Sequence, residues 1–217
     1  MMNGRERMLT ALRFEEPDRP PHFETMFQLE QEAFGLSFPP TAAWQRCTGP
    51  RKREMIRQCM EIYGRILDEF QWDALPVYFP WSDADGVAAA REHYGDRVLI
   101  GSIVGSGVWS IEIISDWMDF SVRLYDARAD LHAEARRLCD TAKGTITRLA
   151  DAGADFILLV NDIADNQGTF LKPEQMRELV LPYLGELVAH VRDCGAIPFV
   201  HTDGNIMSIL DDYIALG

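Results

Sequence analysis

The sequence lacks any apolar run close to the roughly 20 residues that a membrane-spanning helix requires. Its first residues, MMNGRERMLTALRF, also lack the apolar core of a secretory signal. Basic residues are scarce, with 21 Lys and Arg against 34 Asp and Glu, and the net charge is −13. Nucleic-acid binders usually carry a basic patch, so we expect no nucleic-acid partner. The missing apolar runs lead us to expect a cytoplasmic protein with no membrane partner.

Cysteine is also scarce. The four cysteines are scattered, with no C-x-x-C and no H-x-C spacing: Cys47, Cys59, Cys139 and Cys194. This pattern argues against a disulfide scaffold and against a self-contained zinc module. Three of them, Cys59, Cys139 and Cys194, fall within helical patterns, where we expect small buried thiols.

Two stretches of the chain repeat the order helix, glycine, apolar strand. The first consists of 129–152, Gly153 and 155–160, and the second of 173–194, Gly195 and 197–200. A glycine is the usual residue after a helix, and proline at the start of the second helix is also typical. The strands are apolar on both faces, which indicates a parallel sheet covered by helices.

The same order extends over the rest of the sequence. Further strands are predicted at 20–26, 74–79 and 98–104, and further helices at 49–70 and around 111–120. About five βα units with no Pro-, Gly- or Ser-rich linker predict one α/β domain over residues 1–217, either a barrel or a doubly wound sheet. A last helix at 206–216 ends at Gly217, where the next strand should follow. Since a (β/α)8 barrel takes about 250 residues, we expect the first part of a longer barrel.

In both of these folds, functional residues gather at the carboxyl ends of the strands. His201 and Asp203 follow the last predicted strand and are two residues apart in an extended segment, so they point to the same side. Imidazole nitrogen and carboxylate oxygen both bind zinc, which makes the pair a candidate metal site. The alternative is that Asp203 caps a helix beginning near Asn205, with His201 as a core or hydrogen-bonding residue.

A second polar cluster, Asn161, Asp162 and Asp165, follows the strand at 155–160. It suits a general base or the binding of a cationic or hydroxylated substrate, and the alternative is an Asx-rich turn. Other polar or aromatic side chains after predicted strands are Glu24, Trp81, Ser82, Asp83, Asp85 and Trp109. Trp109 ends a glycine-rich run, GSIVGSGVW, that is either a plain turn or a close approach to a bulky ligand.

Three stretches carry a resemblance to a known family. Residues 4–21, GRERMLTALRFEEPDRPP, resemble that family's first helix and the approach to its first strand. Residues 168–195 resemble its F-L-x-P-E…P-Y segment, and HTDGN at 201–205 stands where one branch shows H-x-C-G-N. The family is the uroporphyrinogen decarboxylase (URO-D) superfamily, and that branch is its cobalamin-dependent methyltransferases. The resemblance implies a (β/α)8 TIM barrel, of which this chain holds about five units.

Two departures separate the chain from true decarboxylases. In those enzymes an arginine-rich segment after the first strand clamps the carboxylates of the substrate, whereas residues 22–31, HFETMFQLEQ, contain no arginine. The decarboxylase aspartate after the second strand is also absent, and Pro80 stands near its place. A polycarboxylated tetrapyrrole would meet a site poor in cations, which argues against that substrate.

The resemblance therefore implies a methyltransferase that moves a methyl group between a small methylated compound, a methylated corrinoid or corrinoid protein, and an acceptor. Its branch binds zinc through the His and Cys of H-x-C and a later Cys. Here His201 matches and Asp203 replaces the Cys, which makes a harder site, and the third ligand is expected beyond Gly217. The implied catalytic residues are Asp162, Asn161 and His201, and the implied substrate-binding residues are Glu24, Asp165, Trp109 and Asn205.

Two alternatives to that function stay open from the sequence. One is uroporphyrinogen decarboxylase itself, a lyase of porphyrin biosynthesis. The other is a barrel that binds a corrinoid or small molecule without turnover.

Overall fold

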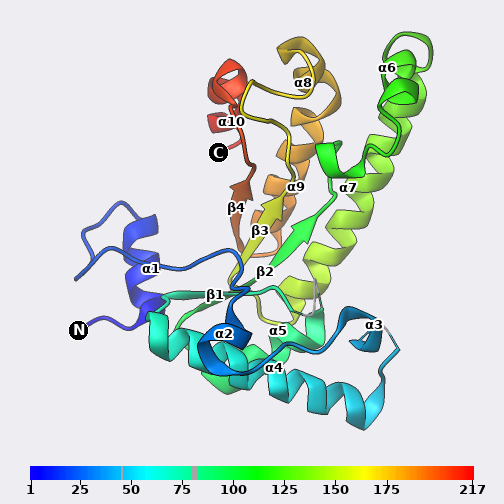
Figure 1. Ribbon diagram of the computed structural model, residues 1–217. Helices are drawn as coiled ribbons and strands as arrows, with labels where there is room; N and C mark the ends of the chain where they lie inside the picture. The colour runs from blue at the N-terminus through cyan, green and yellow to red at the C-terminus, as the bar shows by residue number, and fades with distance from the viewer. Residues whose placement is uncertain (45, 80–82) are drawn as a thin grey trace. The chain divides into compact units, whose positions relative to one another are not determined.

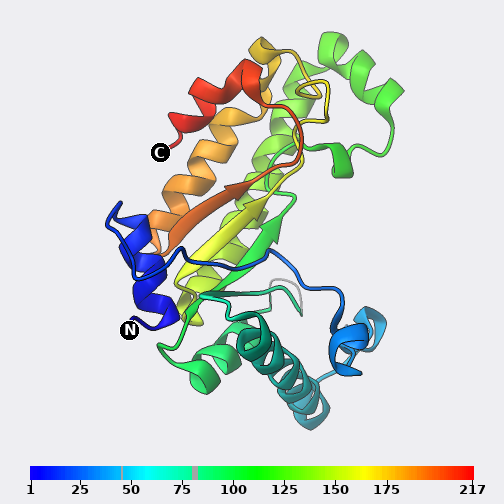
Figure 2. The same cartoon turned by 60° about the vertical axis from the view of Figure 1, so that its left-hand side comes forward.

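The computed structural model describes residues 1–44, 46–79 and 83–217. Within these ranges the strands form one sheet in the order β1-β2-β3-β4. Their bounds are β1 Ala74–Val77, β2 Leu99–Gly105, β3 Phe156–Val160 and β4 Ile197–His201. Strands β1 and β2 are parallel, with Ala74 opposite Leu99, and the arrows of β3 and β4 also run in one direction (Figures 1 and 2).

Helices separate the strands along the chain. They are α1 Gly4–Leu12, α2 Glu30–Phe34, α3 Thr41–Trp44, α4 Gly49–Phe70, α5 Ala84–Tyr94, α6 Trp117–Asp126, α7 Arg128–Asp151, α8 Pro173–Leu179, α9 Leu181–Asp193 and α10 Leu210–Ile214, with 3-10 helices η1 Ile111–Ile113 and η2 Met207–Ile209. The helix predicted at 49–70 is α4, residue for residue. Gly153 and Gly195 follow α7 and α9 at φ of +99° and +78°, the left-handed conformation expected of C-terminal glycines. No helix among the described residues is long and apolar enough to cross a bilayer.

The chain forms two compact units. The first comprises Met1–Ile103 with Leu149–Phe156, and the second comprises Val104–Arg148 with Ile157–Gly217. In the second unit, α7 and α9 run along the same face of β3 and β4 (Figures 1 and 2). The two helices contact each other through His132 of α7, whose Nδ1 lies 3.0 Å from the Tyr183 hydroxyl of α9.

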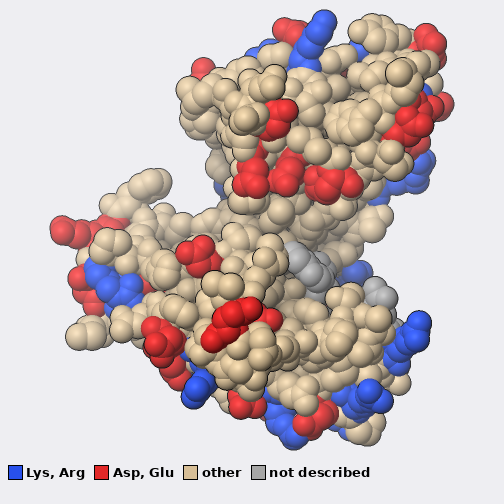
Figure 3. Space-filling model, viewed as in Figure 1, with Lys and Arg blue, Asp and Glu red and all other residues tan. Residues whose placement is uncertain are grey.

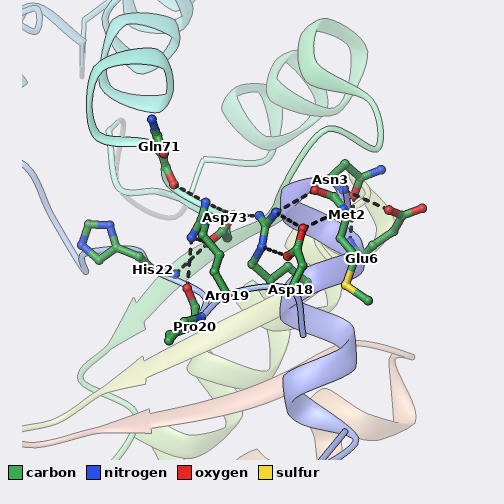
Figure 4. Close-up of polar contacts among 10 residues, drawn as sticks. Met2, Asn3, Glu6, Asp18, Arg19, Pro20, His22, Gln71 and Asp73 are labelled. Atoms are coloured by element: carbon green, nitrogen blue, oxygen red, sulfur yellow. Dashed lines mark hydrogen bonds and ion pairs between the residues drawn. The ribbon is translucent and has the colours of Figure 1, made fainter. Parts of the chain in front are cut away.

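In the first unit, a buried carboxylate ties the N-terminal segment to the start of β1. The Asp73 carboxylate accepts hydrogen bonds from Arg7 Nη1 at 2.5 Å, Arg19 Nη1 at 2.7 Å and the backbone N of His22 at 2.8 Å. Figure 4 shows Arg19 reaching across Asp73 toward the backbone of Gln71. Because the Asp73 side chain is 2% exposed, these partners take the place of the water that the buried carboxylate has lost.

The strand predicted at 20–26 is wrong: that segment joins no sheet among the described residues. Pro20 and Pro21 have no N–H to donate to a ladder. A backbone hydrogen bond joins the segment to the residue before β1, from Asp73 N to His22 O at 2.7 Å. The described sheet therefore has four strands where we predicted about five.

The single helix predicted over 173–194 is also wrong, since the structure divides it into α8 and α9. The break lies at Val180, whose φ of −121° and ψ of −60° leave the helical region. Pro182 explains it, because proline has no N–H for the carbonyl four residues earlier and is tolerated only in a helix's first turn. The predicted helix at 206–216 is shorter, as η2 and α10.

Helix α5 changes the interpretation of the residues after β1. Asp83, which we grouped with possible site residues, is its N-cap and accepts hydrogen bonds from Asp85 N at 2.9 Å and Gly86 N at 3.2 Å. Pro80, Trp81 and Ser82 lie outside the described residues.

Cys59 and Cys139 are buried free thiols, as predicted, and burial raises the pKa of Cys59 to about 12. Cys194 is half-buried, with Sγ 3.7 Å from His190 Nε2. On the face drawn in Figure 3, Lys and Arg lie in separate groups rather than in one band. The expectation about nucleic acid stays a prediction.

Candidate functional site

The loops that follow β3 and β4 are joined to each other in the second unit. Four hydrogen bonds connect them: Asn161 N to His201 O at 3.2 Å, Asp203 N to Asp162 Oδ1 at 3.2 Å, Ile163 N to Thr202 Oγ1 at 3.0 Å, and Asn205 N to Asp165 O at 2.6 Å. Two of the four use side-chain acceptors, so the pairing depends on which residues stand there. These hydrogen bonds therefore fix the two loops, and the side chains that they carry, relative to each other.

Gly204 permits this close approach. Its φ is +89°, and a Cβ at this position would lie 2.5 Å from the backbone C of Ala164 and 2.6 Å from its O. Any side chain would collide with fixed backbone, so only glycine fits both the conformation and the space. The close packing of the two loops thus explains why glycine stands at position 204 of the HTDGN stretch.

Three side chains with metal-binding atoms meet on the paired loops: Asp162, His201 and Asp203. His201 Nε2 is 3.7 Å from Asp203 Oδ1, and one donor atom from each residue lies within 4.8 Å of the others. The Asp203 side chain is 81% exposed and that of His201 35%. One imidazole and two carboxylates are ligands for divalent cations, and with a neutral imidazole they bring two negative charges.

The alternative in which Asp203 caps the following helix is not what the structure shows. The backbone N of Met207, the first residue of η2, donates to Asn205 Oδ1 at 3.0 Å. Asn205, which we expected to bind substrate, therefore accepts this local hydrogen bond. Asp203 remains beside His201 with its carboxylate facing solvent.

Asn161 and Asp165 have structural contacts. Asn161 is 3% exposed and its Oδ1 accepts from Gly107 N at 3.1 Å, while its Nδ2 is buried without a hydrogen-bond partner among the described residues. Asp165 Oδ1 accepts from Gln167 N at 2.8 Å and Gly168 N at 3.1 Å, which is the Asx turn of the alternative reading. Their catalytic and substrate-binding roles stay predictions.

The other two predicted substrate-binding residues are not part of this cluster. Trp109 is 7% exposed, and its indole N–H donates to Leu131 O at 3.1 Å, so the ring is a buried part of the second unit. Glu24 belongs to the first unit, where its exposed carboxylate lies 3.6 Å from His22 Nε2.

The sequence reasoning missed Thr202, which stands between the two candidate ligands. Its hydroxyl accepts from Ile163 N at 3.0 Å and donates to Asp203 O at 2.9 Å, so it fixes both loops. The sequence could have indicated this role. Successive side chains in an extended segment point to opposite sides, so Thr202 must point away from His201 and Asp203.

Comparisons with known proteins give the family and the fold. A family model described as uroporphyrinogen decarboxylase (URO-D) matches residues 82–217, more than half of the chain. The chain belongs to the URO-D family. Among solved structures, a methyltransferase from Methanosarcina mazei aligns over 100% of this URO-D chain and 74% of its own, with a TM-score of 0.74 and 15% identity. The TM-score shows a shared α/β fold, consistent with a partial TIM barrel, and at this identity the likeness shows the fold alone. No curated protein matched the sequence.

Proposed function

We propose that this URO-D family member is a methyltransferase-like enzyme. It moves a methyl group between a small methylated compound and a corrinoid, free or held by a partner protein. The observation that carries the proposal is the meeting of Asp162, His201 and Asp203 on two paired loops at the carboxyl ends of β3 and β4. The fold shared with a methyltransferase supports the same reaction class.

The donor set fits a divalent metal of the kind that the methyltransferase branch implies. His201 and Asp203 would hold it, since Nε2 and Oδ1 are 3.7 Å apart and neither is used by the following helix. When bound, the metal would act as a Lewis acid that lowers the pKa of a coordinated acceptor. Asp162, whose Oδ1 accepts a hydrogen bond from the backbone N of Asp203, would orient the substrate. Asn161, whose Oδ1 accepts from Gly107 N, would hold that backbone in place.

The segment in which the resemblance places the arginine clamp of true decarboxylases argues against a tetrapyrrole substrate, because it is poor in available cations. Residues 22–31 carry no arginine, and Arg19, just before them, is occupied by Asp73. A substrate with several carboxylates would gain little attraction there.

The test is an assay of the full chain with cob(I)alamin and a panel of small methylated amines, methyl thioethers and methyl ethers. The reaction is monitored by the absorbance of the corrinoid. We expect methylcobalamin to form, and we expect His201→Ala to lose the activity while His93→Ala, at an exposed histidine of α5 in the first unit, keeps it. Formation of coproporphyrinogen from uroporphyrinogen would replace this proposal with the decarboxylase. Corrinoid binding without any turnover would replace it with the binding-only barrel.

A further inference from the structure

The candidate site contains no sulfur ligand among the described residues. Its donors are one imidazole nitrogen and two carboxylate oxygens, from His201, Asp203 and Asp162. Thiolates favour soft ions, whereas carboxylates favour ions that also accept water, hydroxyl and carbonyl oxygens. The composition of this site therefore differs in kind from a zinc site built with cysteine.

The distances suit a shared ion after small side-chain rotations. Two donors that each lie about 2.1 Å from one ion are about 3 to 3.5 Å apart. The pair formed by His201 and Asp203 is at 3.7 Å, and all three donors are within 4.8 Å of one another. Because the Asp203 side chain is 81% exposed, it can rotate toward an ion without disturbing packed residues.

Asp162 is oriented for this purpose by a backbone contact. Its Oδ1 accepts from Asp203 N at 3.2 Å, which turns the carboxylate toward the loop that carries the other two donors. Its backbone O accepts from Ile111 N at 2.8 Å, which fixes the residue itself. A ligating carboxylate is commonly held in this way by a second hydrogen bond.

We propose that Asp162, His201 and Asp203 form a complete three-donor site for a divalent cation, and that the remaining coordination positions take oxygen ligands. The substrate or acceptor would then bind the ion through a hydroxyl or carboxylate oxygen rather than a thiol. The inference rests on the proposed function in that it describes the same site, and it assigns Asp162 to the ion instead of to the substrate. The expected third ligand beyond Gly217 is then not required.

The ligand set is tested with Mn2+ alone, titrated into the metal-free full chain and followed by the loss of the free-ion EPR signal. We expect Asp162→Asn, His201→Ala and Asp203→Asn each to weaken Mn2+ binding tenfold or more. Asp162→Asn keeps an oxygen to accept from the amide of Asp203, so the loop pairing should survive. Asp165→Asn is the matched control, since its carboxylate serves a turn, and it should bind Mn2+ as the natural protein does.

Binding of Mn2+ by Asp162→Asn with unchanged affinity would remove Asp162 from the site. An absence of specific Mn2+ binding by the natural chain would overturn the inference altogether. Neither measurement involves methyl transfer, so a chain that binds the ion and transfers no methyl group would refute the proposed function alone.

The class of ligand is tested in two ways. Asp203→Cys should raise the ratio of Zn2+ to Mn2+ affinity tenfold or more, because one oxygen donor becomes a thiolate. In the Co2+-loaded natural chain, glycolate should change the visible absorption at concentrations where 2-mercaptoethanol does not. An unchanged metal ratio in the variant, or a response to the thiol in preference to glycolate, would overturn the oxygen-ligand assignment.

Discussion

His201 and Asp203 lie side by side at the end of β4, with Nε2 of the one 3.7 Å from Oδ1 of the other. They face the same way because they are two apart in an extended segment, and Thr202 between them turns back to bind Ile163 N at 3.0 Å. The same three residues thus supply two candidate ligands and the contact that holds them against the loop after β3.

The structure predicts that the metal-binding and stabilising roles in this segment can be separated. Asp203→Ala should leave the free energy of unfolding nearly unchanged, because the amide of Met207 is bound by Asn205. Asn205→Ala should cost about 1 kcal/mol of stability, the value of one hydrogen bond, and leave the side chains of the candidate site in place. Urea unfolding of both variants checks this. A larger loss for Asp203→Ala than for Asn205→Ala would return the capping role to Asp203.

Replacement of Gly204 should damage the site through the backbone. Gly204→Ala introduces a Cβ about 2.5 Å from the Ala164 backbone at a φ of +89°, so the two loops must separate. We expect a destabilisation of at least 1–2 kcal/mol together with weaker metal binding. Gly168→Ala, in the same loop region with nothing within 4 Å of the new Cβ, is the control and should be close to neutral. Equal behaviour of the two variants in unfolding and metal titration would contradict the loop pairing.

The buried carboxylate before β1 should be among the most sensitive positions of the first unit. Asp73→Asn removes the charge that Arg7 and Arg19 share, in a side chain that is 2% exposed. We expect a loss of about 1–3 kcal/mol, because the buried hydrogen bonds from both arginines are weakened while Arg7 keeps Asp18 as a counter-ion. Asp96→Asn, at an 82% exposed side chain, should change stability by well under 1 kcal/mol. Chemical denaturation measures both, and a similar small effect at the two positions would refute the role of Asp73.

The contact between α7 and α9 should depend on pH in the acid range. Hydrogen bonds from Arg136, and then from Lys143, lower the pKa of Glu186 to about 2 from an ordinary value of 4.5. Since the folded-state pKa is the lower one, the stabilisation is present above about pH 4.5 and is lost as the pH falls toward 2. It should be about 1 kcal/mol or less, because the pair is at the surface.

Unfolding midpoints of the natural chain and of Glu186→Gln should therefore differ at pH 6 and converge toward pH 3. Glu69→Gln, an exposed acid on α4, is the control and should show no such convergence. A difference that stays constant from pH 6 to pH 3 would show that the charge of Glu186 is not responsible.

Some of the fold follows from local chemistry and could be predicted. Gly153 and Gly195 fix the ends of their helices, and the apolar runs after them are β3 and β4. Other features depended on contacts that the sequence does not display. The segment 20–26 looked like a strand, but its His22 is hydrogen-bonded to the side chain and the backbone N of Asp73, the residue before β1.

Part of the candidate site could also be predicted from the sequence. His201 and Asp203 are close in sequence, and Asp162 follows the neighbouring strand, so their meeting is a consequence of parallel strands. The roles of Asn205 and Asp165 as local hydrogen-bond acceptors could not be told from substrate binding, because both uses require the same polar side chains at the same strand ends.

The most direct test of the metal site is X-ray absorption spectroscopy at the zinc edge of the full chain loaded with one equivalent of Zn2+. We predict a first shell of nitrogen and oxygen at about 2.0–2.2 Å, with the outer-shell scattering of one imidazole, and a loss of that imidazole in His201→Ala. A sulfur scatterer at about 2.3 Å, or an unchanged spectrum in His201→Ala, would contradict the account.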